Sequence, residues 1–340
     1  MSPPPAAVVV SPSFGEVVDS VPVTMTEEAR LRRQAFFAVV FAALCIGFSP
    51  VLVRYADVGP AATGFWRLFF ALGPTVVWAF AERRAAGRRP GAAGTGRGPS
   101  VRQFLLAAIA GLFFGADLVA FHSGLARTST ANAVLLGNLA VVFVFVFGWV
   151  FLRERPTRGL LVALVMALSG TLLIISSSAV SGAASGRYAV SVAGDALCVA
   201  AALFYAGYML TTRAVRRVGT GNMAPLGGGM ASLIATSSGA VLCIGWAVAT
   251  GEVLIPQSLQ GLLAVIGLGL VAHATGQGLA TFALGRLPAG LISVVLLLQI
   301  VVGVALAALL FGEVPSLAVF VGGMLVVAGV ATARPNGRAA

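Results

Sequence analysis

Apolar runs about as long as a membrane is thick follow one another along nearly the whole chain. A hydrocarbon core of about 30 Å requires roughly 20 residues of helix, and a backbone in lipid must satisfy its own hydrogen bonds. Only 10% of the 340 residues are charged, against roughly 25% in soluble domains. The sequence therefore predicts an all-α integral membrane protein.

Ten such runs can be drawn between polar, glycine or proline breaks. The predicted spans are residues 35–54, 60–81, 104–125, 130–152, 159–177, 196–213, 228–249, 259–285, 289–311 and 316–333. An even number of spans brings both ends of the chain to the same side of the membrane.

The arginines predict the orientation of these spans. All 22 basic residues are arginine, and most lie in connections that are cytoplasmic if the N-terminus is inside. Only Arg54, Arg127 and Arg187 lie in the opposite connections. Because positive residues are retained in the cytoplasm during insertion, we expect both termini inside, in a plasma membrane of the bacterial inner membrane type. The arginines form short clusters among lipid-embedded runs, so membrane lipid is the expected partner and nucleic acid is not.

Five residue pairs coincide when the sequence is shifted by 159 residues against itself. The pairs are Arg54 with Arg213, Arg127 with Arg286, Glu154 with Glu313, Pro156 with Pro315, and Gly170 with Gly329. This shift moves each predicted span onto the one five later, and an odd number of spans per repeat gives the two copies opposite orientations. We therefore predict two inverted five-helix repeats, an arrangement suited to alternating access. The alternative is a duplication kept for packing alone.

Short motifs in both halves resemble the EamA-type domain of the drug/metabolite transporter superfamily. The motifs are Leu152–Pro156, Phe311–Pro315, Trp66–Ala71, Gly194–Leu197 and Ala283–Ala289. The resemblance covers roughly residues 35–333. It implies a ten-helix inverted-repeat bundle with a central substrate cavity, usually exporting amino acids or other small metabolites across the plasma membrane. Members commonly carry a proline near the middle of spans four and nine, where this chain has Ala140, Val141, Gln299 and Ile300.

The resemblance and the spans together predict five parts. They are a mobile cytoplasmic tail at 1–34, a first repeat at 35–178, an extracytoplasmic connection at 179–192, a second repeat at 193–335, and a cytoplasmic tail at 336–340.

Arg67 and Asp117 are the two charged residues that lie well inside predicted spans. A charge there is unfavourable by at least about 2.5 kcal/mol, which makes both residues functional candidates. The helical rise places them at equal depth on consecutive antiparallel spans. They form either a permanent ion pair, or a pair facing the cavity in which Arg67 holds a substrate carboxylate and Asp117 takes up a proton. Their charges cancel, which suits a zwitterion such as an amino acid.

Other polar or aromatic side chains inside the spans either bond neighbouring helices or line a cavity. They are Trp66, Asn138, Tyr205, Tyr208, His273, Gln277 and Gln299. His273 and Gln277 are four apart and share a helix face, and an imidazole is the natural carrier of a coupling proton. Glu154 and Glu313 lie at helix ends beside proline, where we expect them to fix the turn or to pair with local arginines such as Arg153 and Arg155.

Motifs for catalysis and for nucleotide binding are absent from the sequence, and the cysteines Cys45, Cys198 and Cys243 lack metal-site spacing. We therefore expect no enzymatic activity, no cofactor and no metal. The predicted function is a secondary transporter of a small-molecule substrate, driven by a solute gradient or a coupled proton. The alternatives are efflux of drug-like cations, with Asp117 facing the cation, and a membrane scaffold or intramembrane enzyme that does not transport. Neither motif nor composition indicates an oligomeric state.

Overall fold

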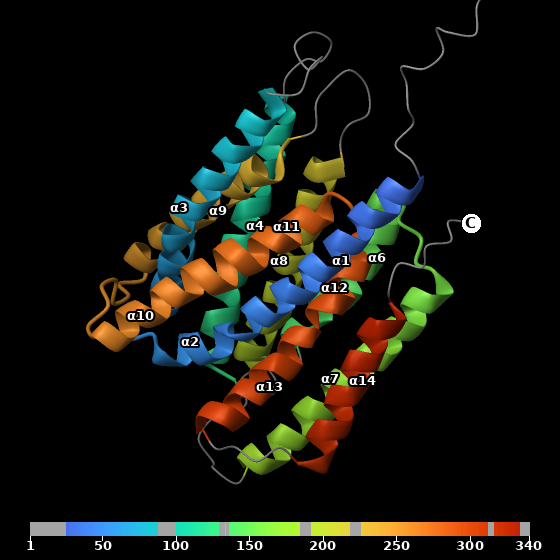
Figure 1. Ribbon diagram of the computed structural model, residues 1–340. Helices are drawn as coiled ribbons and strands as arrows, with labels where there is room; N and C mark the ends of the chain where they lie inside the picture. Colours follow the sequence, from blue (N-terminus) through green and yellow to red (C-terminus); the bar gives the residue numbers. More distant parts are fainter. Residues whose placement is uncertain are drawn as a thin grey trace, which may run out of the picture.

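The computed structural model describes residues 25–87, 100–128, 133, 136–183, 192–217, 226–311 and 316–333 (Figure 1). Every regular element within these ranges is a helix. Among the described residues, seven helical spans are long and apolar enough to cross a membrane. Three shorter apolar helices accompany them, at Leu139–Leu152, Arg158–Ile174 and Leu317–Thr332. These elements confirm the prediction of an all-helical membrane protein.

The helices fall into two series along the chain. The first series is α1 (Met25–Gly47), α2 (Ser49–Tyr55), α3 (Pro60–Gly87), α4 (Val101–Leu125), α6 (Leu139–Leu152) and α7 (Arg158–Ala183). The second series is α8 (Val192–Arg217), α9 (Gly228–Ala249), α10 (Leu259–Gly267), the π-helix η1 (Leu268–Gln277), α11 (Gly278–Leu284), α12 (Ala289–Leu296), α13 (Leu298–Phe311) and α14 (Leu317–Thr332).

Helix α1 begins before the predicted first span, which was residues 35–54. The helices of the first and eighth predicted spans are also less regular than the sequence suggested. Met25 starts α1, so the last part of the predicted tail is helical. A turn at Phe48 separates α1 from α2 within the first span. The predicted span 259–285 contains a π-helix between two α-helices. Glu313, Pro315 and Arg187, which entered the predictions above, lie outside the described residues.

Spans four and nine are interrupted without a proline at corresponding positions. Asn138 precedes α6, and Leu297, its counterpart at the 159-residue shift, separates α12 from α13. At each place the backbone makes a tighter bond of the 3₁₀ type, from Val141 N to the Asn138 carbonyl and from Ile300 N to the Leu297 carbonyl, both at 3.1 Å. Local tightening therefore interrupts these helices close to Ala140 and Gln299, in the region where the family resemblance led us to expect a proline.

Hydroxyl caps also repeat along the chain. The Thr157 hydroxyl accepts a hydrogen bond from Leu160 N before α7, and the Ser316 hydroxyl accepts one from Val319 N before α14. Thr157 and Ser316 are 159 residues apart. A side-chain oxygen at this position satisfies a backbone N–H that the first turn leaves unpaired. The repeat is therefore preserved in how helices start as well as in which residues are charged.

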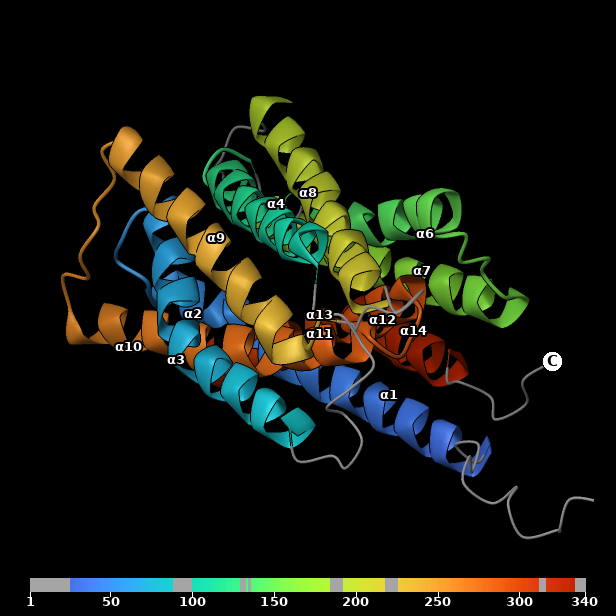
Figure 2. The same ribbon diagram turned by 90° about the horizontal axis from the view of Figure 1, so that it is seen from above.

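The two series pack as a pair of equivalent units (Figures 1 and 2). Helix α3 lies against α9, and α7 lies against α14. The contact of α4 with α8 is matched by that of η1 and α11 with α1, and the contact of α6 with α8 is matched by that of α12 and α13 with α1. For these contacts, exchanging each segment for the one five later therefore returns the matching contact. This is the packing expected from a pseudo-twofold axis.

The crossing of α7 and α14 shows the same exchange at the level of single residues. A β-carbon added at Gly322 would lie 2.6 Å from the carbonyl oxygen of Gly170, and one added at Gly329 would lie 2.9 Å from that of Ala163. The shift of 159 residues converts one contact into the other. Small residues let the two backbones approach closely, as is common where helices pack within a membrane.

Candidate functional site

Arg67 is a buried charge at the junction of the two helix series. It lies on α3, its side chain is 7% exposed, and its guanidinium carbon is 5.8 Å from the ring centre of Phe114 on α4. Its Nε is buried and has no hydrogen-bond partner among the described residues. A buried guanidinium donor without an acceptor is unfavourable, so this group is the main candidate for contact with a ligand.

Side chains from the second series surround the same point. Tyr205 and Tyr208 of α8 have ring centres 5.9 Å apart, and Tyr208 is 4.8 Å from Phe114. The Tyr208 hydroxyl is 3.2 Å from that of Thr281 on α11. Gln277 Nε2 donates to the Tyr205 hydroxyl at 3.4 Å. We call Arg67, Phe114, Tyr205, Tyr208, His273 and Gln277 the central cluster, because α3, α4, α8 and η1 all contribute to it.

His273 is the second residue of the central cluster with an unsatisfied nitrogen. It is 4% exposed, and its ring centre is 5.1 Å from that of Phe114. Its Nε2 lies 3.0 Å from the Thr236 hydroxyl of α9, while its Nδ1 is buried and has no partner in the part of the chain that the structure describes. The central cluster therefore holds two buried nitrogen atoms, one on each helix series, that lack the hydrogen bond their burial demands.

The π-helix η1 carries both His273 and Gln277. Thr275 donates its hydroxyl to the Leu270 carbonyl five residues earlier at 2.9 Å. Glycine at Gly276 lets η1 approach α1, because a β-carbon there would lie 2.7 Å from the Ile46 side chain. π-Helical turns are rare and occur frequently at functional sites. Both predicted polar residues of this span are buried, as the shared face suggested.

Asp117 of α4 is near Arg67 without forming an ion pair with it. The two charges act on each other, yet within the described residues no ion pair of 4.0 Å or less joins them. The half-buried carboxylate is thus separate from the guanidinium. The permanent salt bridge that the sequence allowed as an alternative is not formed in this conformation.

Three other predicted site residues are not part of the central cluster as defined above. Trp66 donates its indole N–H to the Leu254 carbonyl at 2.7 Å and stacks on Phe70, so it anchors α3 to the connection before α10. Asn138 lies at the start of α6. Gln299 lies on α13, where its backbone carbonyl faces Gly47 of α1. Trp66 adjoins Arg67 in sequence, but consecutive helix positions point in different directions.

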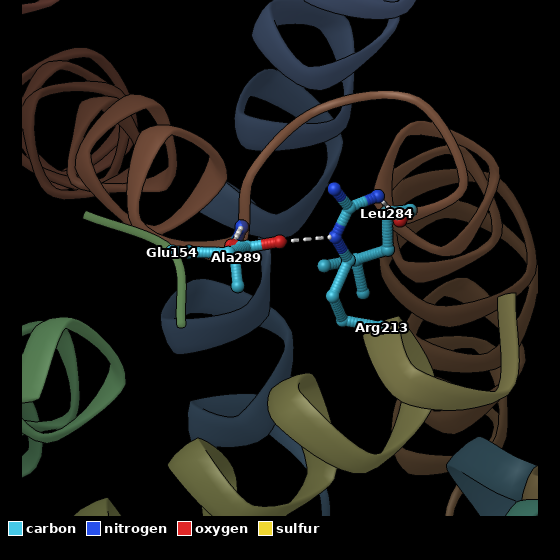
Figure 3. A network of polar contacts seen from close by, with 4 residues as sticks. All are labelled: Glu154, Arg213, Leu284 and Ala289. Atoms are coloured by element: carbon cyan, nitrogen blue, oxygen red, sulfur yellow. Dashed lines mark hydrogen bonds and ion pairs between the residues drawn. The ribbon is translucent and has the colours of Figure 1, made fainter. Parts of the chain in front are cut away.

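Glu154 joins four helix ends at one face of the molecule (Figure 3). Its Oε1 accepts a hydrogen bond from Arg213 Nε at 2.8 Å, and its Oε2 accepts one from the backbone N–H of Ala289 at 3.0 Å. Arg213 Nη1 donates to the Leu284 carbonyl at 2.6 Å. We expected Glu154 to fix the turn or to pair with local arginines such as Arg153 and Arg155; among the described residues it forms an ion pair with an arginine of the other helix series. We refer to this side of the molecule as the Glu154 face.

Two further carboxylates were not selected from the sequence. Glu82, near the end of α3, accepts hydrogen bonds from Gly228 N at 3.1 Å and Gly229 N at 2.7 Å, at the start of α9. Glu252, just after α9, accepts them from Ala61 N at 2.8 Å and Ala62 N, at the start of α3. Each carboxylate compensates the positive end of a helix dipole. The scarcity of acidic residues in the chain was the signal that could have identified them.

A surface hollow of about 350 Å³ lies between α3 and the consecutive helices η1 and α11, and its lining residues are not those of the central cluster. Pro74, Trp78, Leu279 and Phe282 are among its lining residues. Its volume is within the range of ligand pockets, but the lining is apolar apart from threonine hydroxyls. A lipid chain fits this chemistry better than a polar metabolite.

Comparison with protein-family models assigns the chain to a family. The model of the EamA-like transporter family matches residues 33–176 and again residues 192–333. The chain belongs to the EamA-like transporter family. The first matched block ends within α7 and the second begins at the start of α8, which agrees with the two-repeat layout of the fold. Membership in the EamA-like transporter family indicates a multi-pass membrane transporter of the drug/metabolite type.

Solved structures support the same fold. One crystal structure superposes with a TM-score of 0.65 at 19% sequence identity, covering 88% of this chain and 96% of its own. This similarity shows a common architecture for an EamA-like chain. No match was found among curated proteins.

Proposed function

We propose that this protein is a secondary transporter that exports an amino acid, or a related zwitterion or organic anion, across the plasma membrane. The observation that carries the proposal is the buried guanidinium of Arg67, whose Nε has no acceptor in the described structure. A carboxylate is the natural partner of such a group, because arginine binds carboxylates through charge-assisted hydrogen bonds. His273 Nδ1 offers a second unsatisfied nitrogen in the same cluster.

The proposed mechanism is alternating access between two inverted five-helix repeats, ten membrane spans in all, with both termini cytoplasmic. The exchange of neighbours between the two helix series supports this arrangement. Two pseudo-equivalent packings of one unit allow a central site to open to either side of the membrane in turn. The central cluster takes its residues from both series, so a relative movement of the two changes the access to Arg67.

Asp117 gives the site its second charge. Because it is near Arg67 but not paired with it, its carboxylate is available to a substrate ammonium group or to a coupling proton. A zwitterion placed between the two residues would satisfy both charges and leave the membrane interior electrically neutral. This arrangement favours an amino acid over a solute with only one charge.

Flux into proteoliposomes tests the proposal. The purified chain is reconstituted, a panel of labelled amino acids and organic acids is offered, and uptake is measured at two pH values. We expect Arg67→Gln to reduce flux of a carboxylate substrate by at least about tenfold, the effect of losing a buried charged hydrogen bond. Arg127→Gln, an exposed residue away from the central cluster, is the matched control. Full flux in Arg67→Gln would contradict the assigned role.

Asp117 also supports an alternative function, the efflux of drug-like cations. Its half-buried carboxylate has no ion pair with Arg67 in the described conformation, and an acid within a membrane-spanning helix attracts a cation. A competition experiment, in which hydrophobic amines are added during amino acid flux, distinguishes amino acid export from cation efflux. If hydrophobic amines inhibit or replace the amino acid and Asp117→Asn abolishes their movement while Arg67→Gln does not, cation efflux is the correct function.

A further inference from the structure

The Glu154–Arg213 pair closes one end of the junction between the two helix series (Figure 3). Glu154 follows α6, in the first series, while Arg213, Leu284 and Ala289 belong to α8, α11 and α12 of the second. The pair ties these four helix ends together with one ion pair and two hydrogen bonds to backbone groups. Any opening of the junction at the Glu154 face must separate at least one of these contacts.

The energetics of the pair suit a contact that forms and breaks. Its side chains are 9% and 12% exposed, so closing the face removes both charges from most of their water. Desolvation of a buried ion pair offsets much of its attraction. When the face opens, water returns to both groups and recovers that desolvation. The closed and open arrangements therefore differ little in free energy, although a single charge left behind would be strongly unfavourable.

The chain is strained immediately beside the pair. Arg153 has φ = 54°, and it is the only non-glycine residue with positive φ among those described. This left-handed residue ends α6, and Glu154 N then bonds back to the Gly148 carbonyl at 3.1 Å. A left-handed conformation is unfavourable by roughly 1–2 kcal/mol for an ordinary residue. The strain is retained where it directs Glu154 toward Arg213, and such strain gathers at mobile or functional positions.

The contacts between α3 and α9 have the opposite character. Glu82 caps α9 on the Glu154 side of the molecule, and Glu252 caps α3 at the other end of the same helix pair. Helices α3 and α9 are thus joined at both of their ends at once. A helix pair held at both faces is a fixed support, whereas a pair of charges at one face is free to open.

We infer that Glu154 and Arg213 form a latch that holds the Glu154 face closed and breaks each time the transporter opens on that side. This inference rests on the proposed transport function. The positioning role belongs to the pair as a unit: Glu154 retains the loop at Ala289, and Arg213 retains the end of α11 at Leu284. Loss of either charge leaves the other buried charge without this counter-ion, which favours the conformation in which that charge reaches water.

Cysteine labelling in lipid nanodiscs tests the latch without any substrate. Ala283, adjacent to Leu284, is fully buried and is replaced conservatively by Ala283→Cys as a reporter. A water-soluble maleimide reaches both faces of a nanodisc, and the unmodified chain, whose three cysteines are buried, gives the background rate. We expect Glu154→Gln and Arg213→Gln each to raise the reporter's labelling rate by about tenfold through a population shift. Arg213→Lys, which keeps the charge, should raise it much less.

Glu82→Gln is the matched control on the same side of the molecule. It also removes a carboxylate that caps a helix, but it should lower thermal stability without changing reporter labelling. Equal labelling in Glu82→Gln and Glu154→Gln would mean general loosening and would overturn the latch. So would unchanged labelling in both latch variants.

The double variant Glu154→Gln with Arg213→Gln covers the case in which a single variant fails to fold. It removes both charges of the pair, so we expect its labelling rate not to exceed that of either single variant and not to reach their combined effect. An additive result would show that the two residues act separately and would contradict the proposal. A chain that labels as expected but moves no solute from the panel would refute the transport proposal and leave the latch measurement intact.

Discussion

Glu82 and Glu252 form reciprocal helix caps: Glu82 of α3 caps the start of α9, and Glu252, just after α9, caps the start of α3. Glu82 lies in the last turns of α3 and accepts hydrogen bonds from the first backbone N–H groups of α9. Glu252 follows α9 and accepts hydrogen bonds from the first backbone N–H groups of α3. Because the two helices are antiparallel, the caps lie at opposite ends of one helix pair. The pseudo-twofold packing of the chain thus includes contacts that the 159-residue match of charged residues did not reveal.

These reciprocal caps should stabilise the fold independently. Removing either charge in Glu82→Gln or Glu252→Gln should lower the free energy of unfolding by about 1–2 kcal/mol, because a charged cap at a helix N-terminus is lost. The two effects should add in the double variant, since the sites share no partner. Denaturation in detergent measures all three, with the exposed Glu27→Gln as control. A double variant no weaker than the singles would show that the caps are coupled.

Replacing Arg153 should relieve the strain before Glu154. Glycine adopts a positive φ without steric conflict, so Arg153→Gly should raise the melting temperature by an amount equivalent to about 0.5–1 kcal/mol after the entropy of the unfolded chain is included. Arg153→Val should lower it, because a β-branched side chain resists this conformation. A higher melting temperature for Arg153→Val than for Arg153→Gly would show that the positive φ at this residue does not reduce the stability of the protein.

A pair of glycine substitutions distinguishes close helix contact from helix propensity. Gly322→Ala should destabilise the protein by about 1–3 kcal/mol, because its β-carbon would press on the Gly170 carbonyl at the α7–α14 crossing. Gly159→Ala in the first turn of α7 meets nothing within 4 Å, and should stabilise by up to about 1 kcal/mol through helix propensity alone. Melting temperatures in the same detergent compare the two. A neutral Gly322→Ala would show that the crossing is loosely packed.

Asp57 should make stability fall in acid. The Ser258 hydroxyl donates to its carboxylate at 2.7 Å and Gln257 N at 3.1 Å, and these bonds lower the pKa of Asp57 below its usual value. A lowered pKa means that the stabilisation is complete above about pH 4 and is lost as the pH falls through the folded-state pKa. Melting curves of the parent should therefore decline more steeply below about pH 4 than those of Asp57→Asn. Parallel curves would contradict this.

The helical segments and their pairing across the two halves were predictable from local features. Apolar runs of the required length predicted the helices, and the scarcity of charge made the matches Arg54–Arg213 and Glu154–Glu313 noticeable. The departures have local causes as well. Tight turns interrupt the helices at Asn138 and Leu297, and a π-helix forms part of one predicted span. These departures were not predictable from hydropathy, because a change of hydrogen-bond partner by one residue leaves the hydropathy of the segment unchanged.

The site was predicted less completely than the fold. Arg67, Tyr205, Tyr208, His273 and Gln277 do come together, since a polar side chain within an apolar run must face protein. Trp66 does not join them, because its indole found a carbonyl in a connection almost two hundred residues away. Glu154 forms an ion pair with Arg213 of the other helix series, because the partner of a carboxylate at a helix end depends on which helix end lies opposite.

By itself, the order of residues determined that this chain is a membrane-embedded helical protein made of two related halves. That follows because hydropathy and scarce charges act locally, one helix at a time. Only the tertiary structure decided which charges meet, which helix ends are capped by distant carboxylates, and which buried nitrogens remain unsatisfied. Those outcomes depend on the rotation and depth of each helix against its neighbours, and packing between residues far apart in the chain sets both.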